Sequence, residues 1–146
     1  MTIIIDASII ISALINPNGK EAVLILNYSG KVDFVAPDLM YKEVLSKKSK
    51  IIKFSHHTES TLQTSLELIT NNISVFSVSK YDADILKVAQ QLTSDIDEND
   101  VQYIALAILL EGLFWTGDLR LLRGIKRKGF SHIITTLDFE EIVKGL

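Results

Sequence analysis

Short runs of apolar, mostly β-branched residues alternate with longer helical stretches along this chain, and this alternation constrains the fold most strongly. The first run, Ile3-Ile4-Ile5, shows no polar alternation, which is typical of a parallel strand buried on both faces. Strands that alternate with helices form parallel sheets joined by helical crossovers. We therefore expect an α/β fold, a three-layer α/β/α sandwich with a central, mainly parallel sheet of about five strands.

The expected elements follow one another without a linker, an internal repeat or a low-complexity tract. We therefore expect residues 1–146 to form a single domain. Strands are expected at 2–5, 32–35, 73–78, 113–116 and 133–135. Helices are expected at 8–15, 21–28, from Pro37 through 45, 58–70, 81–92, 97–111, 118–128 and 137–144.

Cysteine is absent, which excludes a disulfide scaffold, a thiolate zinc site and a cysteine nucleophile. With three histidines in the chain, a His-rich zinc site is disfavoured as well. A metal would therefore be held mainly by oxygen ligands, which suit Mg²⁺ or Mn²⁺. The net charge of −3 argues against a generally basic surface that binds nucleic acid. The apolar stretch 1–15 is interrupted by Asp6 and is too short to span a bilayer, so we expect a cytoplasmic protein without membrane association.

Four acidic residues are candidates for a functional site, because ligand sites of parallel α/β sheets lie at the carboxyl ends of the strands. Asp6 directly follows the first strand, and Asp118 follows the fourth strand after one glycine, so both lie at carboxyl ends of strands. Glu43 lies on the helix after Pro37, and Asp100 lies in the first turn of the helix that continues at Val101. If these carboxylates converge, their mutual repulsion calls for a cation. A divalent cation there would activate water for attack on a phosphodiester.

Each acid also has an ordinary structural explanation, and the pattern alone leaves both open. Asp6 and Asp118 could cap the helices that begin after them. Asp97 and Asp100 have the spacing of a cap and its partner three residues later, and Glu43 could be a solvated helix residue.

Four motifs at these acids resemble, in order and over essentially the whole chain, those of the PIN-domain family of metal-dependent ribonucleases. They are Asp6-Ala7-Ser8 after a hydrophobic strand, Glu43 before an apolar residue, Asp100 before an Ala-rich helix, and Trp115-Thr116-Gly117-Asp118 after a strand. The likeness is greatest to stand-alone bacterial and archaeal members, which include toxins of toxin–antitoxin pairs.

The resemblance implies a divalent-metal-dependent endoribonuclease that hydrolyses RNA phosphodiesters by activated water, using Mg²⁺ or Mn²⁺ and no covalent intermediate. It implies four acids that bind the metal and act in catalysis, with two hydroxyl residues that orient Asp6 and Asp118. The acids are Asp6, Glu43, Asp100 and Asp118, and the hydroxyl residues are Ser8 and Thr116.

Asp97 is a second candidate for the third acid, because it lies one helical turn before Asp100. We favour Asp100, since it directly precedes the Ala-rich run, and we expect Asp97 to cap that helix.

The resemblance also implies an RNA substrate and a homodimer, with an antitoxin protein as partner if the chain is a toxin. Two alternatives are a catalytically silent PIN-like module that binds RNA and a receiver-type phospho-acceptor domain. The receiver alternative is disfavoured because the first strand is followed by one acid and residues 77–80 contain none.

Ten of the 15 Lys and Arg residues fall in two stretches, 42–53 and 118–128, each beginning at or beside a proposed site acid. They could form a positive rim that neutralises phosphates, or they could be solvated helix faces. Trp115 and Tyr103 lie in apolar runs and are expected in the core, and His56-His57 is expected in a loop or at a helix start.

Overall fold

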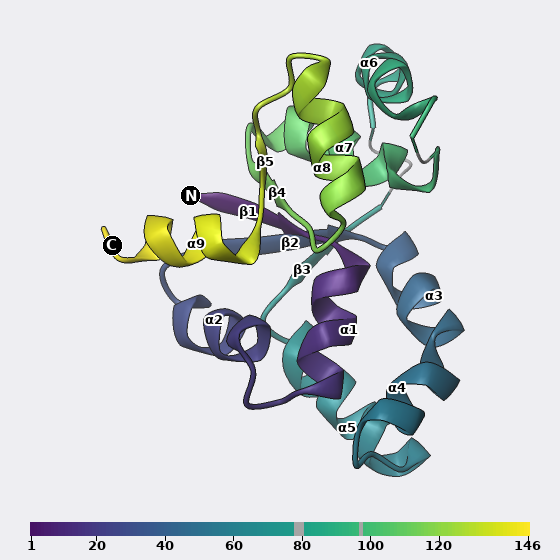
Figure 1. Cartoon of the computed structure of the whole chain (residues 1–146), viewed down its shortest axis with the longest axis vertical. Coiled ribbons are helices and arrows are strands. Elements are labelled where there is room, and N and C mark those ends of the chain that lie inside the picture. Colours follow the sequence, from purple (N-terminus) through teal and green to yellow (C-terminus); the bar gives the residue numbers. More distant parts are fainter. Residues whose placement is uncertain (78–80, 97) are drawn as a thin grey trace.

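The computed structural model describes residues 1–77, 81–96 and 98–146, and at its centre is a parallel sheet with the strand order β3-β2-β1-β4-β5 (Figure 1). Every pairing between neighbouring strands is parallel, which confirms the predicted α/β class. Val78, the last residue of the third predicted strand, lies outside the described residues. The strands are β1 (Thr2–Ile5), β2 (Asp33–Pro37), β3 (Ser74–Phe76), β4 (Leu113–Trp115) and β5 (Ile133–Ile134).

Helices cover both faces of this sheet, as a three-layer sandwich requires. The helices α6, α7 and α8 lie on one side, and α1, α2, α5 and α9 lie on the other (Figure 1). The helical bounds are α1 (Ala7–Ile15), α2 (Lys20–Tyr28), α3 (Leu39–Ser46), α4 (Lys48–Phe54), α5 (Glu59–Thr70), α6 (Ala83–Thr93), η2 (Glu98–Asp100, a 3₁₀ turn), α7 (Val101–Leu110), α8 (Leu119–Arg127) and α9 (Thr136–Val143).

The strand order places a crevice at the carboxyl ends of β1 and β4. The chain builds outward from β1 through β2 to β3, and then returns to the other side of β1 to form β4. Ile4 is paired with Val35 of β2 on one side and with Phe114 of β4 on the other. Ligands of parallel sheets bind where the strand order reverses in this way, so β1 and β4 flank the expected binding position.

The core explains why the first strand shows no polar alternation. Ile3, Ile4 and Ile5 are all fully buried, because the sheet carries helices on both faces. Tyr103 of α7 and Trp115 of β4 are also fully buried, which confirms their predicted place in the core. The indole N–H of Trp115 donates to Thr136 Oγ1 at 3.1 Å, so its one polar group is satisfied.

Pro37 is the last residue of β2, so the prediction that it opens a helix is wrong. The backbone N–H of Asp38 donates to the carbonyl of Phe76, and successive N–H groups of a strand point to opposite sides. Pro37, which has no N–H, therefore occupies a position that does not donate to β3. The following helix begins at Leu39, with Asp38 as its N-cap residue.

Other expected boundaries differ by a few residues, and one helix is absent from the prediction. The unpredicted helix is α4, which lies in the lysine-rich stretch. Its one buried residue is Ile51, so its sequence lacks the regular spacing of apolar residues that indicates a helix. The helix expected over 97–111 is divided into η2 and α7. His56 and His57 precede the N-cap of α5, as predicted.

No single helix in the described part of the chain is both long and apolar enough to cross a membrane. The helices α1 and α2 reach that length and hydropathy as a pair, with a bend of 107° between them.

Gly112 is expected to be essential to the junction of α7 and β4. A Cβ at this position would lie 2.6 Å from Ile4 Cδ1 and 2.8 Å from the carbonyl oxygen of Thr2. Because the β1 backbone would have to shift, we expect Gly112→Ala to lower the free energy of unfolding by about 1–3 kcal/mol in urea denaturation. Gly30→Ala is the matched control, since a Cβ there meets no heavy atom within 4 Å. Equal midpoints for the two variants would contradict this packing.

Candidate active site

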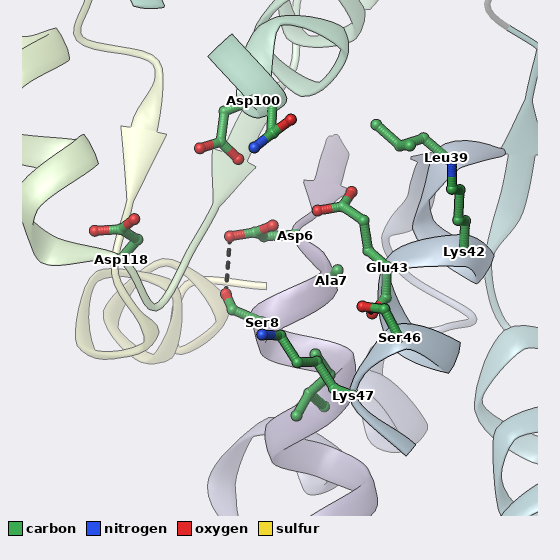
Figure 2. A pocket seen from close by; sticks show the side chains of 12 residues that line it. Asp6, Ala7, Ser8, Leu39, Lys42, Glu43, Ser46, Lys47, Asp100 and Asp118 are labelled. Atoms are coloured by element: carbon green, nitrogen blue, oxygen red, sulfur yellow. Dashed lines mark hydrogen bonds between the residues drawn. The ribbon is translucent and has the colours of Figure 1, made fainter. Parts of the chain in front are cut away.

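A cavity of about 470 Å³ opens at the carboxyl end of the sheet, and all four described acids singled out in the sequence line it. They come from four different elements: Asp6 from the β1–α1 junction, Glu43 from α3, Asp100 from the η2–α7 junction and Asp118 from the β4–α8 turn. Figure 2 shows their carboxyl groups around one space, with Asp6 between Asp118 and Glu43 in this view. The fold therefore gathers acids that are far apart in the sequence.

Asp6 is held at the bottom of this cavity by two hydroxyl groups. Its Oδ2 accepts a hydrogen bond from Thr116 Oγ1 at 2.6 Å and another from Ser8 Oγ at 2.8 Å. Asp6 is also the N-cap residue of α1, but its side chain makes no capping hydrogen bond. The hydroxyls of Thr116 and Ser8, more than helix capping, therefore orient this carboxylate.

The same two hydroxyls hold the turn that follows β4. Thr116 Oγ1 accepts from the backbone N–H of Asp118 at 3.0 Å, and Ser8 Oγ accepts from the backbone N–H of Gly117 at 3.2 Å. Both hydroxyls therefore orient Asp6, and Thr116 positions Asp118 through its backbone. The hydrogen bond between Thr116 and Asp118 involves the backbone N–H of Asp118, whereas the Asp118 carboxylate accepts from the backbone of α8.

Burial raises the pKa of Asp6 above its ordinary value, and the hydrogen bonds from Thr116 and Ser8 oppose this shift. The residue is 6% exposed, so the ionised carboxylate has lost most of its hydration. A cation in the cavity would offset the remaining unfavourable energy of the charge.

Asp118 combines the two explanations that its sequence context allows. Its Oδ1 accepts from the backbone N–H of Leu121 at 3.1 Å, so it caps α8, and the residue also lines the cavity. Asp100 is 7% exposed and is the N-cap residue of α7, without a capping hydrogen bond from its side chain. Asp97, the other candidate for the third acid, lies outside the described residues.

Glu43 is held by a buried tyrosine that the sequence reasoning assigned only to the core. The phenolic hydroxyl of Tyr103 donates to Glu43 Oε1 at 2.7 Å, across 60 residues of sequence. Burial and the neighbouring Glu43 carboxylate raise the pKa of Tyr103, so the phenol remains a donor. The Tyr103 ring stacks on Phe114 of β4 with 5.4 Å between ring centroids, which holds the hydroxyl in place.

Several polar residues of the cavity were not predicted individually. Lys42, Ser46 and Lys47 come from α3 and its C-terminal end, and Asn99 comes from η2. Both lysines belong to the basic stretch 42–53, and that concentration of charge is the sequence feature that indicates them. They place positive charge beside four acids in one cavity.

The chemistry of these donors fits a hard divalent cation, because they are carboxylates accompanied by hydroxyl and amide groups. Among the residues that the structure describes, no three acids or histidines are grouped closely enough to hold one metal ion. The acids surround the cavity and would have to draw inward to share an ion.

A sequence model of the PIN domain matches residues 4–138 of this chain. The chain belongs to the PIN-domain family. This confirms the predicted family, and it leaves no support for the receiver-type alternative. PIN nucleases typically use divalent metals, which agrees with the chemistry of the cavity described above.

Solved structures show the same fold across nearly the whole PIN domain. PAE2754 from Pyrobaculum aerophilum is 14% identical with a TM-score of 0.66, and the match covers 100% of this chain and 97% of that chain. VapBC2 from Rickettsia felis, bound to a DNA fragment from its promoter, is 12% identical with a TM-score of 0.64 and coverages of 92% and 97%. VapBC-1 from nontypeable Haemophilus influenzae is 17% identical with a TM-score of 0.61 and coverages of 94% and 99%. No curated protein gives a significant match.

The buried charge of Asp6 predicts a pH-dependent gain in stability for Asp6→Asn. The raised pKa means that the folded state binds more protons than the unfolded state above the ordinary value of 3.8, so ionisation of Asp6 lowers stability as pH rises. Asparagine keeps an acceptor oxygen for both hydroxyls and removes the charge. In EDTA we expect Asp6→Asn to have the higher urea midpoint at neutral pH.

We expect this advantage to shrink as pH falls through the raised pKa of folded Asp6 and to vanish below 3.8, where the wild-type carboxyl becomes neutral in both states. Urea titrations at a series of pH values measure it, with the exposed Asp33→Asn as the matched control. A lower midpoint for Asp6→Asn at neutral pH would contradict the desolvation of Asp6.

Tyr103→Phe tests the support of Glu43. Removing the phenolic hydroxyl leaves the Glu43 carboxylate without this donor, and we expect the free energy of unfolding to fall by about 1–3 kcal/mol. Tyr41→Phe on α3 is the control, since Tyr41 is exposed. Denaturation curves that shift equally for both variants would show that the Tyr103 hydrogen bond contributes nothing.

Proposed function

We propose that this PIN-domain protein is a divalent-metal-dependent endoribonuclease that hydrolyses RNA phosphodiesters with Mg²⁺ or Mn²⁺. The observation that carries the proposal is the convergence of four acids from four elements on one cavity that two lysines also line. Four acids alone would repel an RNA strand, and lysines beside them can neutralise its phosphates.

The residues of the chain prepare the cavity for this reaction. Ser8 and Thr116 hold Asp6 in one orientation, and Tyr103 holds Glu43, so these two carboxylates are positioned before a ligand binds. Lys42 and Lys47 supply positive charge for phosphate groups of the strand beside the scissile bond.

A divalent cation, when bound, lowers the pKa of water and stabilises the negative charge that develops at phosphorus. The Ser8 and Thr116 hydroxyls both donate to Asp6, so neither is arranged as a nucleophile. We therefore propose direct hydrolysis: water forms the new bond to phosphorus, and the bond from phosphorus to the leaving ribose oxygen breaks.

We further propose that the protein is the toxin of a toxin–antitoxin pair, with an antitoxin protein as partner and a homodimeric assembly. This is supported by the similarity of its fold to two VapBC structures and by the likeness of its motifs to stand-alone toxin members of the family.

Cleavage of single-stranded RNA by the purified protein in Mn²⁺ tests the nuclease proposal. We expect Asp6→Asn and Asp100→Asn each to reduce the cleavage rate more than about 100-fold, because loss even of groups that support metal ligands costs 10- to 100-fold. Asp33→Asn is the control, since it changes the same functional group at the exposed start of β2.

Cleavage that persists in both site variants would overturn the assignment of these acids. RNA binding without cleavage in any divalent metal would instead support the catalytically silent module.

A further inference from the structure

Helix α8 carries a row of cations that the cavity of acids does not include. Its inner face buries Leu121, Leu122 and Ile125 against the core. Its outer face exposes four basic residues to solvent, namely Arg120, Arg123, Lys126 and Arg127. The helix thus has a strongly basic face over its whole length.

The arginines of this face have no carboxylate partners within residues 1–77, 81–96 and 98–146. Lys128, just beyond the helix, is different, because its ammonium group forms an ion pair with Asp95. Arg123 and Arg127 each donate from Nε to the backbone carbonyl of the residue four positions earlier, which lays their side chains along the helix. These charges therefore do not serve to hold the fold together by ion pairing.

Helix stability does not explain the position of Arg120 either. Cations complement the dipole in the last turn of a helix, where Lys126 and Arg127 lie. Arg120 is the second residue of α8, at the end where the dipole disfavours a positive charge. A ligand that carries negative charge would account for it.

A hollow of about 420 Å³ lies beside this basic face. Ile96 and Gly124 give part of its lining an apolar surface, and a Cβ on Gly124 would collide with the Ile96 side chain. Asp95 also lines the hollow, where its carboxylate is paired with Lys128. Arg120 and Arg127 lie seven residues apart on one face of α8, roughly 10 Å along its axis at 1.5 Å per residue. Their guanidinium groups can therefore reach different phosphates of one extended strand.

We propose that this hollow and the arginines of α8 bind the phosphate backbone of the RNA strand whose scissile bond lies in the cavity of acids. The inference rests on the proposed function and specifies where the substrate runs. Asp118 lines the cavity of acids and is the N-cap residue of α8, and Arg120, which lines the hollow, lies two residues further along the chain. Both surfaces therefore include residues at the start of α8. Lys42 and Lys47 line the cavity from α3, on its other side (Figure 2).

Guanidinium groups suit this role because they bind phosphate oxygens in pairs and remain charged. Contacts to phosphates carry no base information, so α8 would bind RNA of any sequence. The strand would pass from the lysines of α3 across the acids to the arginines of α8.

Fluorescence anisotropy with a labelled single-stranded RNA, measured in EDTA to prevent cleavage, tests this path. We expect Arg120→Gln and Arg127→Gln each to lower the salt slope of log Kd by about 1, and the double variant to bind roughly tenfold more weakly. Lys31→Gln is the matched control, because Lys31 is an exposed cation that precedes β2, at the amino end of the parallel strands and away from the cavity at their carboxyl ends. Far-UV circular dichroism melts verify that the variants are folded.

A double variant with the Kd and salt slope of Lys31→Gln would overturn the proposal, as would wild-type protein that does not bind RNA. RNA binding that depends on α8 without cleavage in Mn²⁺ would support the path and contradict the nuclease function. Cleavage by a double variant that binds RNA as the wild type does would contradict the path alone.

Discussion

Two hydroxyl groups that donate to one carboxylate oxygen of Asp6 connect the strands between which the order of the sheet reverses. Thr116 lies 110 residues from Asp6 in the sequence, so its hydrogen bond forms only when β1 and β4 are paired. Thr116 and Ser8 also accept hydrogen bonds from the turn after β4. The position of Asp118 and the start of α8 therefore follow from the same small network around a buried charge.

Acidic and basic side chains occupy different regions of the molecule, which the net charge of −3 does not show. Acids converge on one cavity, while the basic residues concentrate on α3, α4 and α8. Within the first basic stretch, Lys48 forms an exposed ion pair with Glu59 at 2.8 Å, whereas Lys42 and Lys47 line the cavity. The first basic stretch thus contains lysines that line the cavity of acids and a lysine that is engaged in a surface ion pair.

Local sequence was sufficient to predict the strands, because Ile3-Ile4-Ile5 and the later apolar runs are buried on a two-sided sheet. It was also sufficient to place Asp6 and Asp118 at one edge, since parallel strands share their carboxyl ends. Pro37 was misassigned because its sequence context fits a helix start as well as the end of a strand. Only the paired strands show which of these applies.

Contacts between distant residues could not be predicted in this way. Tyr103 lies in an apolar run that indicates a core position, and its hydrogen bond to Glu43 depends on where the fold places α7 relative to α3. Asn99 and the hollow beside α8 likewise depend on the packing of separate elements. Asp118 was a candidate both for a helix cap and for the site, and it has both positions in the structure: it caps α8 and lines the cavity. A sequence pattern cannot separate these two roles.

Whether the acids of this cavity hold a divalent cation is tested most directly by diffraction from crystals soaked in Mn²⁺, with data collected at the manganese absorption edge. We predict an anomalous difference peak in the cavity, in contact with the Asp6 carboxylate, and its loss in Asp6→Asn. A protein that cleaves RNA in Mn²⁺ while its crystals show no such peak in the cavity would contradict a metal-dependent site built on these acids.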